Sequence, residues 1–229
     1  MTRLVRAVLF DVDFTLAKPG PLLGPEGYRV VGERHGLVLD PDRYADARAA
    51  AVTDLEHHPE LDHDDEVWIR FTEDIVRGMG GKGDRIRTIA EEITRGWERS
   101  DNFELYEDAL PALDALRGLG LAIGLVSNTN RDLDAFLRHF RLEVDAWISS
   151  GKHGKVKPSP TIFRAVLELL EVEPQEAAMI GDSPVDDVEG ARALGMQAFL
   201  IDREGRFPDR DDALPDLLAL PAALGFRVD

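Results

Sequence analysis

Short apolar runs alternate with amphipathic repeats along the chain, and this alternation predicts an α/β protein. Residues 7–10 form a continuous apolar run, which is typical of a buried parallel strand. Similar runs predict four further strands, at 121–126, 145–148, 177–180 and 197–201. Helical spacing of apolar residues predicts helices at 108–117, 131–140, 160–170, 185–194 and near 214–218. The pattern therefore predicts a Rossmann-like, three-layer core with a parallel sheet.

A helical region interrupts this alternation after the first strand. Between residues 17 and 105 we find four amphipathic stripes and no strand pattern; the stripes begin near Pro25, Asp40, Asp64 and Ile86. Apolar stripes of this kind most often form the core of a small helical bundle. We therefore expect an α/β core made of residues 1–16 and 106–229, with an inserted all-helical module at 17–105.

Two carboxylates follow the first strand, where open α/β sheets place their ligands. Asp11 and Asp13 lie two positions apart, so an extended chain directs both side chains to one side. Neighbouring carboxylates repel each other unless a cation lies between them or one keeps its proton. The pair alone is equally compatible with a polar turn and with a functional site.

Polar residues also follow other predicted strands. Ser127 and Asn128 come after the strand at 121–126, Asp182 follows 177–180, and Lys157 lies in a loop that holds three of the five lysines. Because the carboxyl ends of parallel strands meet at one edge of a sheet, these groups should converge. Several carboxylates there would suit a hard divalent cation with oxygen ligands, and Lys157 would add one positive charge.

Four segments in this order resemble the haloacid dehalogenase superfamily, most closely its phosphatase branch with a helical C1-type cap. They are Asp11–Leu16, Ser127-Asn128, Lys157-Pro158 and the run 181–187 (Gly-Asp-Ser-Pro-Val-Asp-Asp). The resemblance implies that residues 17–105 are a cap that excludes water and selects the substrate. At position 14, Phe14 departs from the commoner family pattern, where a small or polar residue, often glycine, is found.

The resemblance also implies roles for individual residues. Asp11 matches the nucleophile that becomes an aspartyl-phosphate, and Asp13 matches the general acid and base. Asp182 matches a direct ligand of Mg²⁺, together with Asp11 and the backbone carbonyl of Asp13. Ser127 and Asn128 match residues that bind the phosphoryl oxygens, and Lys157 matches the lysine that balances their charge. Asp187 matches a supporting acid.

These residues predict a Mg²⁺-dependent phosphatase that acts on a small phosphorylated metabolite. The alternatives are a dehalogenase or a phosphosugar mutase on the same scaffold, or a receiver-like protein that is phosphorylated on Asp11 without turnover. Receivers lack a helical insertion after the first strand. Dehalogenases of this superfamily lack an aspartate at the position of Asp13, because a halide leaves without needing a proton.

Composition excludes several other classes. The formal net charge of −17 argues against nucleic acid or an anionic membrane as a partner. The chain has no cysteine, so it has neither disulfides nor thiolate chemistry. No apolar stretch has the length of a membrane span or a signal peptide, and we expect a cytoplasmic protein. His57, His58 and His63 are interpreted as loop residues, and the oligomeric state is left open.

Overall fold

The computed structural model describes residues 5–56 and 62–226, which leaves His57 and His58 outside the described residues. By contacts between residues, the chain divides into two compact units. One consists of Met1–Lys18 with Leu105–Asp229, and the other is Pro19–Glu104. Each unit has its own core, so each is described by itself.

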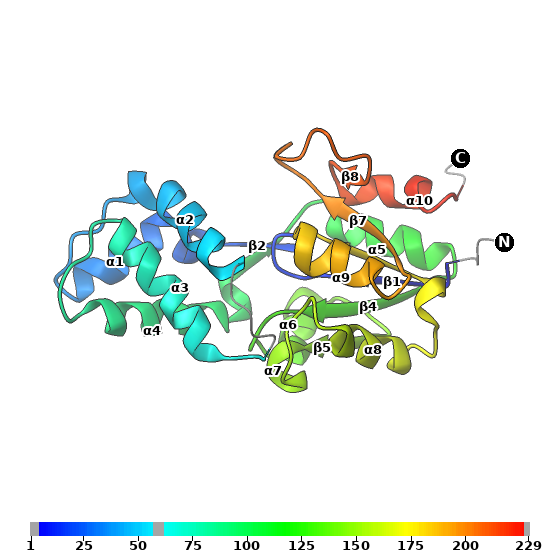
Figure 1. Cartoon of the computed structure of the whole chain (residues 1–229), viewed down its shortest axis with the longest axis horizontal. Helices are drawn as coiled ribbons and strands as arrows, with labels where there is room; N and C mark the ends of the chain where they lie inside the picture. Colours follow the sequence, from blue (N-terminus) through cyan, green and yellow to red (C-terminus); the bar gives the residue numbers. More distant parts are fainter. Residues whose placement is uncertain (1–4, 57–61, 227–229) are drawn as a thin grey trace. The chain divides into compact units, whose positions relative to one another are not determined.

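The first unit is built on a six-stranded sheet with the order β5-β4-β1-β6-β7-β8 (Figure 1). Every neighbouring pair is parallel. The strands are β1 (Ala7–Phe10), β4 (Ala122–Ser127), β5 (Ala146–Ser149), β6 (Ala177–Gly181), β7 (Gln197–Ile201) and β8 (Ala213–Leu214). The apolar run at 7–10 thus forms a central strand that is buried on both faces.

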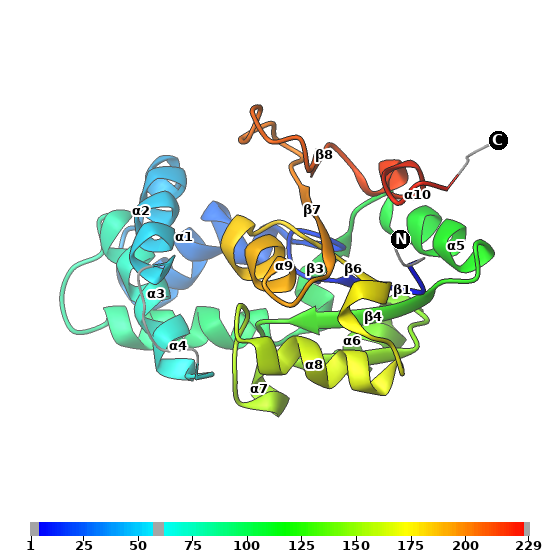
Figure 2. The ribbon, with the colours of Figure 1, turned by 45° about the vertical axis from the view of Figure 1, so that its right-hand side comes forward.

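Helices cover both faces of this sheet. The helices are α5 (Ala109–Gly118), α6 (Leu133–Phe140), α7 (Ser150–His153), α8 (Pro160–Leu169), α9 (Gly190–Arg192) and α10 (Leu220–Ala223). In Figure 2, α5 and α10 lie on one side of the sheet and α8 on the other. On the α8 side, Leu9, Met179 and Leu200 pack against Phe163 and Val166. Because side chains alternate along a strand, the remaining strand positions face the layer that holds α5 and α10. The prediction of a three-layer α/β core is therefore confirmed.

The second unit is helical. It consists of α1 (Pro25–Arg34), α2 (Tyr44–Glu56), α3 (Asp65–Gly78) and α4 (Ile86–Trp97). Its core includes Tyr28, Ile75, Ile89 and Ile93, which belong to the predicted apolar stripes, and also Met79. The side chain of Asp64 accepts a hydrogen bond from Glu66 N at 2.9 Å and caps α3, as its position before an acidic first turn indicates.

One local prediction was wrong, and two were right only in part. Strand pairing does occur at the ends of the segment 17–105, where β2 (Ala17–Pro19) pairs with β3 (Phe103–Leu105). The helix expected near 214–218 begins only at Leu217, as a 3-10 turn (Leu217–Ala219) that leads into α10, whereas residues 213–214 form a sixth strand because they pair with β7. The helix expected at 185–194 is a π-helical segment, Pro184–Glu189, followed by the short α9. The strands β2, β3 and β8 form because each pairs with a strand that is distant in the sequence. In segments of two or three residues, such pairing leaves little signal in the sequence.

Candidate active site

Three strand ends bring the predicted site residues to one edge of the sheet. Asp11 follows β1, Ser127 ends β4 and Asp182 follows β6. The N–H of Asp11 donates to the carbonyl of Ile180 at 2.8 Å, which extends the pairing of β1 with β6 up to the carboxylate. Asp11 and Ser127 are both buried. The edge is therefore rigid where the polar side chains emerge.

Lys157 joins two of the acids. Its Nζ donates to Asp11 Oδ1 at 2.5 Å and to Asp187 Oδ1 at 2.6 Å. All three side chains are nearly fully buried. The resulting Asp11–Lys157–Asp187 triad is charge-assisted and desolvated, a setting in which such hydrogen bonds are strong.

Asp187 is held against the sheet by the π-helical segment. Its Oδ2 accepts a hydrogen bond from Ser183 N at 3.0 Å, while Oδ1 faces Lys157. A Cβ atom added to Gly181 would lie only 2.1 Å from Asp187 Oδ2, so only glycine permits this close approach. Asp186 is less buried than Asp187. The motif spacing therefore selects the acid that contacts Lys157.

The side chain of Asn128 contacts the backbone of Lys157 and holds it in place. Lys157 N donates to Asn128 Oδ1 at 2.7 Å, and Asn128 Nδ2 donates to the carbonyl of Lys157 at 3.2 Å. Asn128 Nδ2 carries a second N–H, so a bond to a phosphoryl group would come from that N–H or from the backbone N–H of Asn128. By contrast, the hydroxyl of Ser127 makes no hydrogen bond within residues 5–56 and 62–226. Ser127 thus remains a candidate for phosphoryl binding.

The electrostatics of the site indicate a shortage of positive charge. Burial raises the pKa of Asp11 well above its ordinary value; Lys157 opposes this shift, and the carboxylates of Asp187, Asp182 and Asp13 reinforce it. Burial by itself would lower the pKa of Lys157, but the carboxylates of Asp11 and Asp187 outweigh it and raise that pKa above its usual range. Lys157 therefore stays protonated, whereas Asp11 needs a further cation nearby to be stable as a carboxylate.

Sequence reasoning missed Arg131. Its guanidinium forms two hydrogen bonds to Asp13, from Nη1 to Oδ1 at 2.8 Å and from Nη2 to Oδ2 at 3.0 Å. The Arg131 side chain has no exposed surface, and that of Asp13 is 19% exposed. Arg131 precedes α6 and looked like an ordinary helix start. The only signal in the sequence was its position four residues after Ser127.

The donor set fits a hard divalent cation. Asp11, Asp182 and Asp187 each offer a carboxylate oxygen, and these three atoms lie within 4.8 Å of one another. With Asp13 included, four carboxyl groups face two cations, Lys157 and Arg131, so the acidic groups outnumber the cations by two. Because both Asp187 oxygens already accept hydrogen bonds, whereas Lys157 contacts only Oδ1 of Asp11, Asp11 is a better candidate for a direct ligand than Asp187.

Phe14 adopts a left-handed backbone conformation with φ of 63° directly after Asp13. The N–H of Phe14 donates to the carbonyl of Ala17 at 2.6 Å, which closes the tight turn that follows the acidic pair. Non-glycine residues rarely adopt this conformation. The turn geometry therefore explains why glycine suits position 14, and it shows that this chain tolerates an aromatic residue there.

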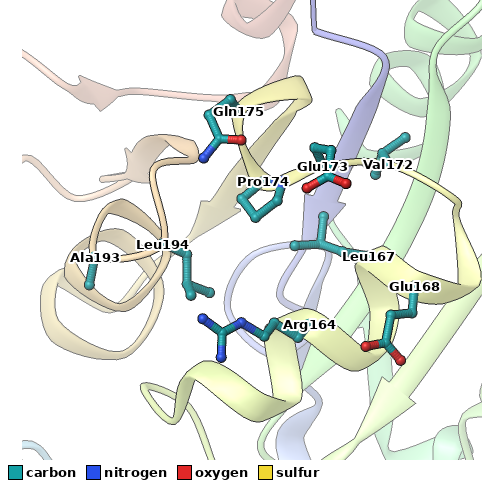
Figure 3. Close-up of a pocket in the computed structure, with 9 residues that line it drawn as sticks. All are labelled: Arg164, Leu167, Glu168, Val172, Glu173, Pro174, Gln175, Ala193 and Leu194. Atoms are coloured by element: carbon teal, nitrogen blue, oxygen red, sulfur yellow. The ribbon is translucent and has the colours of Figure 1, made fainter.

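A pocket of about 470 Å³ lies elsewhere in the first unit (Figure 3). Arg164 and Leu167 of α8 line it together with Pro174 and Leu194. Pro174 precedes β6, whereas Asp182 follows it, so the pocket opens at the opposite end of that strand from the carboxylates. No residue of the Asp11–Lys157–Asp187 triad lines this pocket. We therefore do not assign it to the active site.

Comparison with known proteins connects this geometry to a family. A family model for haloacid dehalogenase-like hydrolases matches residues 5–195. Phosphoserine phosphatase from Thermus thermophilus is 37% identical over 155 residues, a match that covers 65% of this chain and 59% of that protein. The crystal structure of an HAD phosphatase from Thermococcus onnurineus has a TM-score of 0.66 and 29% identity, and covers 98% of this chain and 100% of that one.

Dehalogenases share the fold as well. The 2-haloacid dehalogenase from Pseudomonas syringae has a TM-score of 0.63 at 24% identity, over 96% of this chain and 98% of that one, which shows the fold alone. The family model spans Asp11, Ser127, Lys157 and Asp182, the residues that the fold brings to one edge. This chain therefore belongs to the haloacid dehalogenase-like hydrolase family and is an enzyme, a hydrolase.

Proposed function

We propose that this hydrolase is a phosphatase of small phosphate monoesters that works through an aspartyl-phosphate on Asp11. The observation that carries the proposal is the buried triad in which Lys157 joins Asp11 and Asp187. Phosphoryl transfer depends mainly on positioning and on neutralising negative charge, and this triad provides both around one carboxylate nucleophile. The phosphatase relatives reported above support the same reaction class.

The reaction then proceeds in two balanced steps. A carboxylate oxygen of Asp11 forms a bond to phosphorus while the bond from phosphorus to the leaving oxygen breaks, and Asp13 gives that oxygen a proton. Water next attacks phosphorus and gives a proton to Asp13, and the oxygen of Asp11 leaves as a carboxylate. Lys157 remains protonated throughout, in keeping with its raised pKa.

The cofactor in this proposal is Mg²⁺, held by Asp11, Asp182 and the backbone carbonyl of Asp13. When bound, it supplies positive charge beside the phosphoryl oxygens. The three acidic oxygens within 4.8 Å of one another and the raised pKa of Asp11 support this assignment. Ser127, with its hydroxyl facing no protein partner among the described residues, would bind a phosphoryl oxygen, as would the backbone N–H of Asn128.

Asp13 favours a phosphatase over a dehalogenase. An alkoxide is a strong base and needs a proton as it leaves, whereas a halide is already a stable anion. General acid–base help is worth roughly 10²–10⁴-fold in rate. A carboxylate that serves only as a surface group would not require a fully buried arginine as its partner, and Asp13 has one.

The helical unit is proposed to act as the cap that restricts substrate size. Support comes from its place in the chain directly after Asp11–Leu16 and from its independent core. A cap that closes would favour small monoesters and exclude folded phosphoproteins. Efficient hydrolysis of a folded phosphoprotein together with poor rates on small esters would rule out this part of the proposal.

The cytoplasmic location stays a prediction from the sequence. None of the described helices is long and apolar enough to cross a membrane.

A release assay tests the main proposal. The wild type is incubated with p-nitrophenyl phosphate and a panel of small phosphorylated metabolites that includes phosphoserine, with Mg²⁺ or with EDTA. We expect multiple turnovers with Mg²⁺, loss of activity in EDTA and recovery when Mg²⁺ is restored. Asp11→Asn should abolish turnover. A single burst without turnover would indicate the phosphoacceptor alternative, halide release from 2-haloacids a dehalogenase, and an isomeric phosphosugar product a mutase.

A further inference from the structure

Arg131 has a more completely buried side chain than Lys157, the other cation that the described residues place beside the reacting carboxylates. Its side chain is fully buried, which is uncommon for arginine, and both terminal nitrogens donate to Asp13 at 2.8 and 3.0 Å. Its N–H donates to Thr129 Oγ1 at 3.1 Å, and its Cζ lies 5.2 Å from the ring centroid of Phe136. Arg131 is thus held at its backbone by Thr129 and at its guanidinium by Asp13 and the ring of Phe136.

The geometry of this pair defines an orientation as well as a charge. Two parallel N–H bonds fix the plane of the Asp13 carboxylate, which a single ammonium could not do. Ion pairs in protein interiors are weak evidence for stability, because desolvation offsets much of the attraction. A role in stability alone therefore accounts poorly for a buried guanidinium at this particular carboxylate.

We propose that Arg131 is a positioning residue that holds Asp13 in the orientation needed for proton transfer. The inference rests on the proposed function, in which Asp13 gives a proton to the leaving oxygen and later takes one from water. Arg131 keeps its own proton in both steps. Its two N–H groups compensate the negative charge that appears on Asp13 when the proton leaves.

A direct contact between Arg131 and the substrate is the competing explanation. Both Nη atoms already donate to Asp13, and the side chain has no exposed surface, so a phosphoryl group could reach it only if this pair separated. The two explanations differ in what they predict for binding. A positioning role leaves KM nearly unchanged, whereas loss of a phosphate contact raises it.

The test uses substituted phenyl phosphates, which have similar size but different leaving-group basicity. We compare the wild type with Arg131→Met, Arg131→Lys, Asp13→Asn and the double variant Asp13→Asn/Arg131→Met. Arg138→Met is the matched control, because Arg138 is an exposed arginine on α6. The first-step rate is measured as the burst of phenol, so that slow hydrolysis of the aspartyl-phosphate does not mask it.

We expect Arg131→Met to slow the first step on phenyl phosphate by about 10²-fold and on p-nitrophenyl phosphate by less than about tenfold, with KM within about twofold. The rate should therefore depend more steeply on leaving-group basicity than in the wild type. The first-step rates of Arg131→Lys should lie between those of the wild type and Arg131→Met. Those of Arg138→Met should match the wild type. In the Asp13→Asn background, the Arg131→Met change should cause no further loss.

Equal losses across the phenyl series, a rise in KM that accounts for the loss, or additive losses in the double variant would each overturn the proposal. If Arg131→Met does not fold, Arg131→Lys carries the test, because it retains the charge and loses the fork. If the first-step rate of Arg131→Lys then depends on leaving-group basicity as in the wild type, the proposal is overturned. Failure of the proposed function looks different, since the wild type itself would release no phenol from any of these esters.

Discussion

The side chain of Asn128 is bonded to both backbone polar groups of Lys157, accepting from its N–H at 2.7 Å and donating to its carbonyl at 3.2 Å. Lys157 in turn reaches Asp11 and Asp187 with its ammonium. An amide that follows β4 thereby sets the position of a cation that lies in a different loop, 29 residues further along the chain. The relationship connects the second and third predicted motifs physically.

Replacing Asn128 should therefore impair catalysis through Lys157. Asn128→Ala removes both hydrogen bonds, so we expect a loss of about 1–2 kcal/mol in the free energy of unfolding and a fall in kcat of roughly 10-fold to 10²-fold. Asn128→Asp keeps an acceptor for Lys157 N but loses the donor, and should lie between Ala and the wild type. Steady-state kinetics with p-nitrophenyl phosphate and urea unfolding measure the two effects. An unchanged kcat in Asn128→Ala would contradict this view.

Asp182 should matter for the metal more than for folding. Asp182→Asn removes one of the clustered oxygens, and we expect the Mg²⁺ concentration for half-maximal activity to rise at least about tenfold. The metal-free protein should not become less stable, because the Asp182 carboxylate raises the pKa of Asp11 and so destabilises ionised Asp11. The readouts are Mg²⁺ titrations of activity and thermal unfolding in EDTA.

Asp186→Asn is the matched control for Asp182→Asn, because Asp186 lies in the same motif run, 181–187, and outside the acidic cluster. Its Mg²⁺ dependence should resemble that of the wild type. A shift of similar size in both variants would mean that general charge around the segment, and not ligation by Asp182, controls metal affinity.

The left-handed conformation of Phe14 leads to a prediction about stability. Phe14→Gly and Phe14→Ala both remove the ring, but only glycine adopts a φ of 63° without strain. Because a left-handed conformation costs other residues roughly 1–2 kcal/mol, Phe14→Gly should be more stable than Phe14→Ala by about 1 kcal/mol. Chemical unfolding of the two variants at equal pH measures the difference. If alanine is as stable as glycine, the turn must relax when the ring is lost.

Asp202 provides a prediction about pH. Its carboxylate accepts hydrogen bonds from Arg206 N and Phe207 N, each at 2.8 Å. Burial opposes the shift, but these N–H groups prevail and hold the pKa of Asp202 below its ordinary value of 3.8. A carboxylate with a lowered pKa in the folded state stabilises that state above its ordinary pKa. This contribution disappears as the pH falls through the folded-state value.

The stability difference between the wild type and Asp202→Asn should therefore be constant above about pH 5 and shrink below 3.8. Urea unfolding of both proteins across this range measures it. A difference that grows in acid would reverse the assigned sign.

The sequence by itself determined the elements that depend on local patterns. The run at 7–10 reads as a buried strand because both faces of β1 are covered, and a helix is expected to begin near Asp64 because its apolar stripe repeats within the segment itself. The order of four polar segments, each after a strand or before a helix, was enough to indicate the family. The cap role of residues 17–105 and the roles of the site residues stay predictions.

Tertiary structure decided which of these groups meet. Lys157 and Asp11 are separated by 146 positions, and Arg131 and Asp13 by 118, so no local pattern records either contact. The direction of the Asn128 side chain and the pairing of β8 with β7 likewise depend on distant backbone. Arg131 escaped notice for this reason: an arginine before a helix is ordinary in sequence, and only burial against Asp13 makes it exceptional.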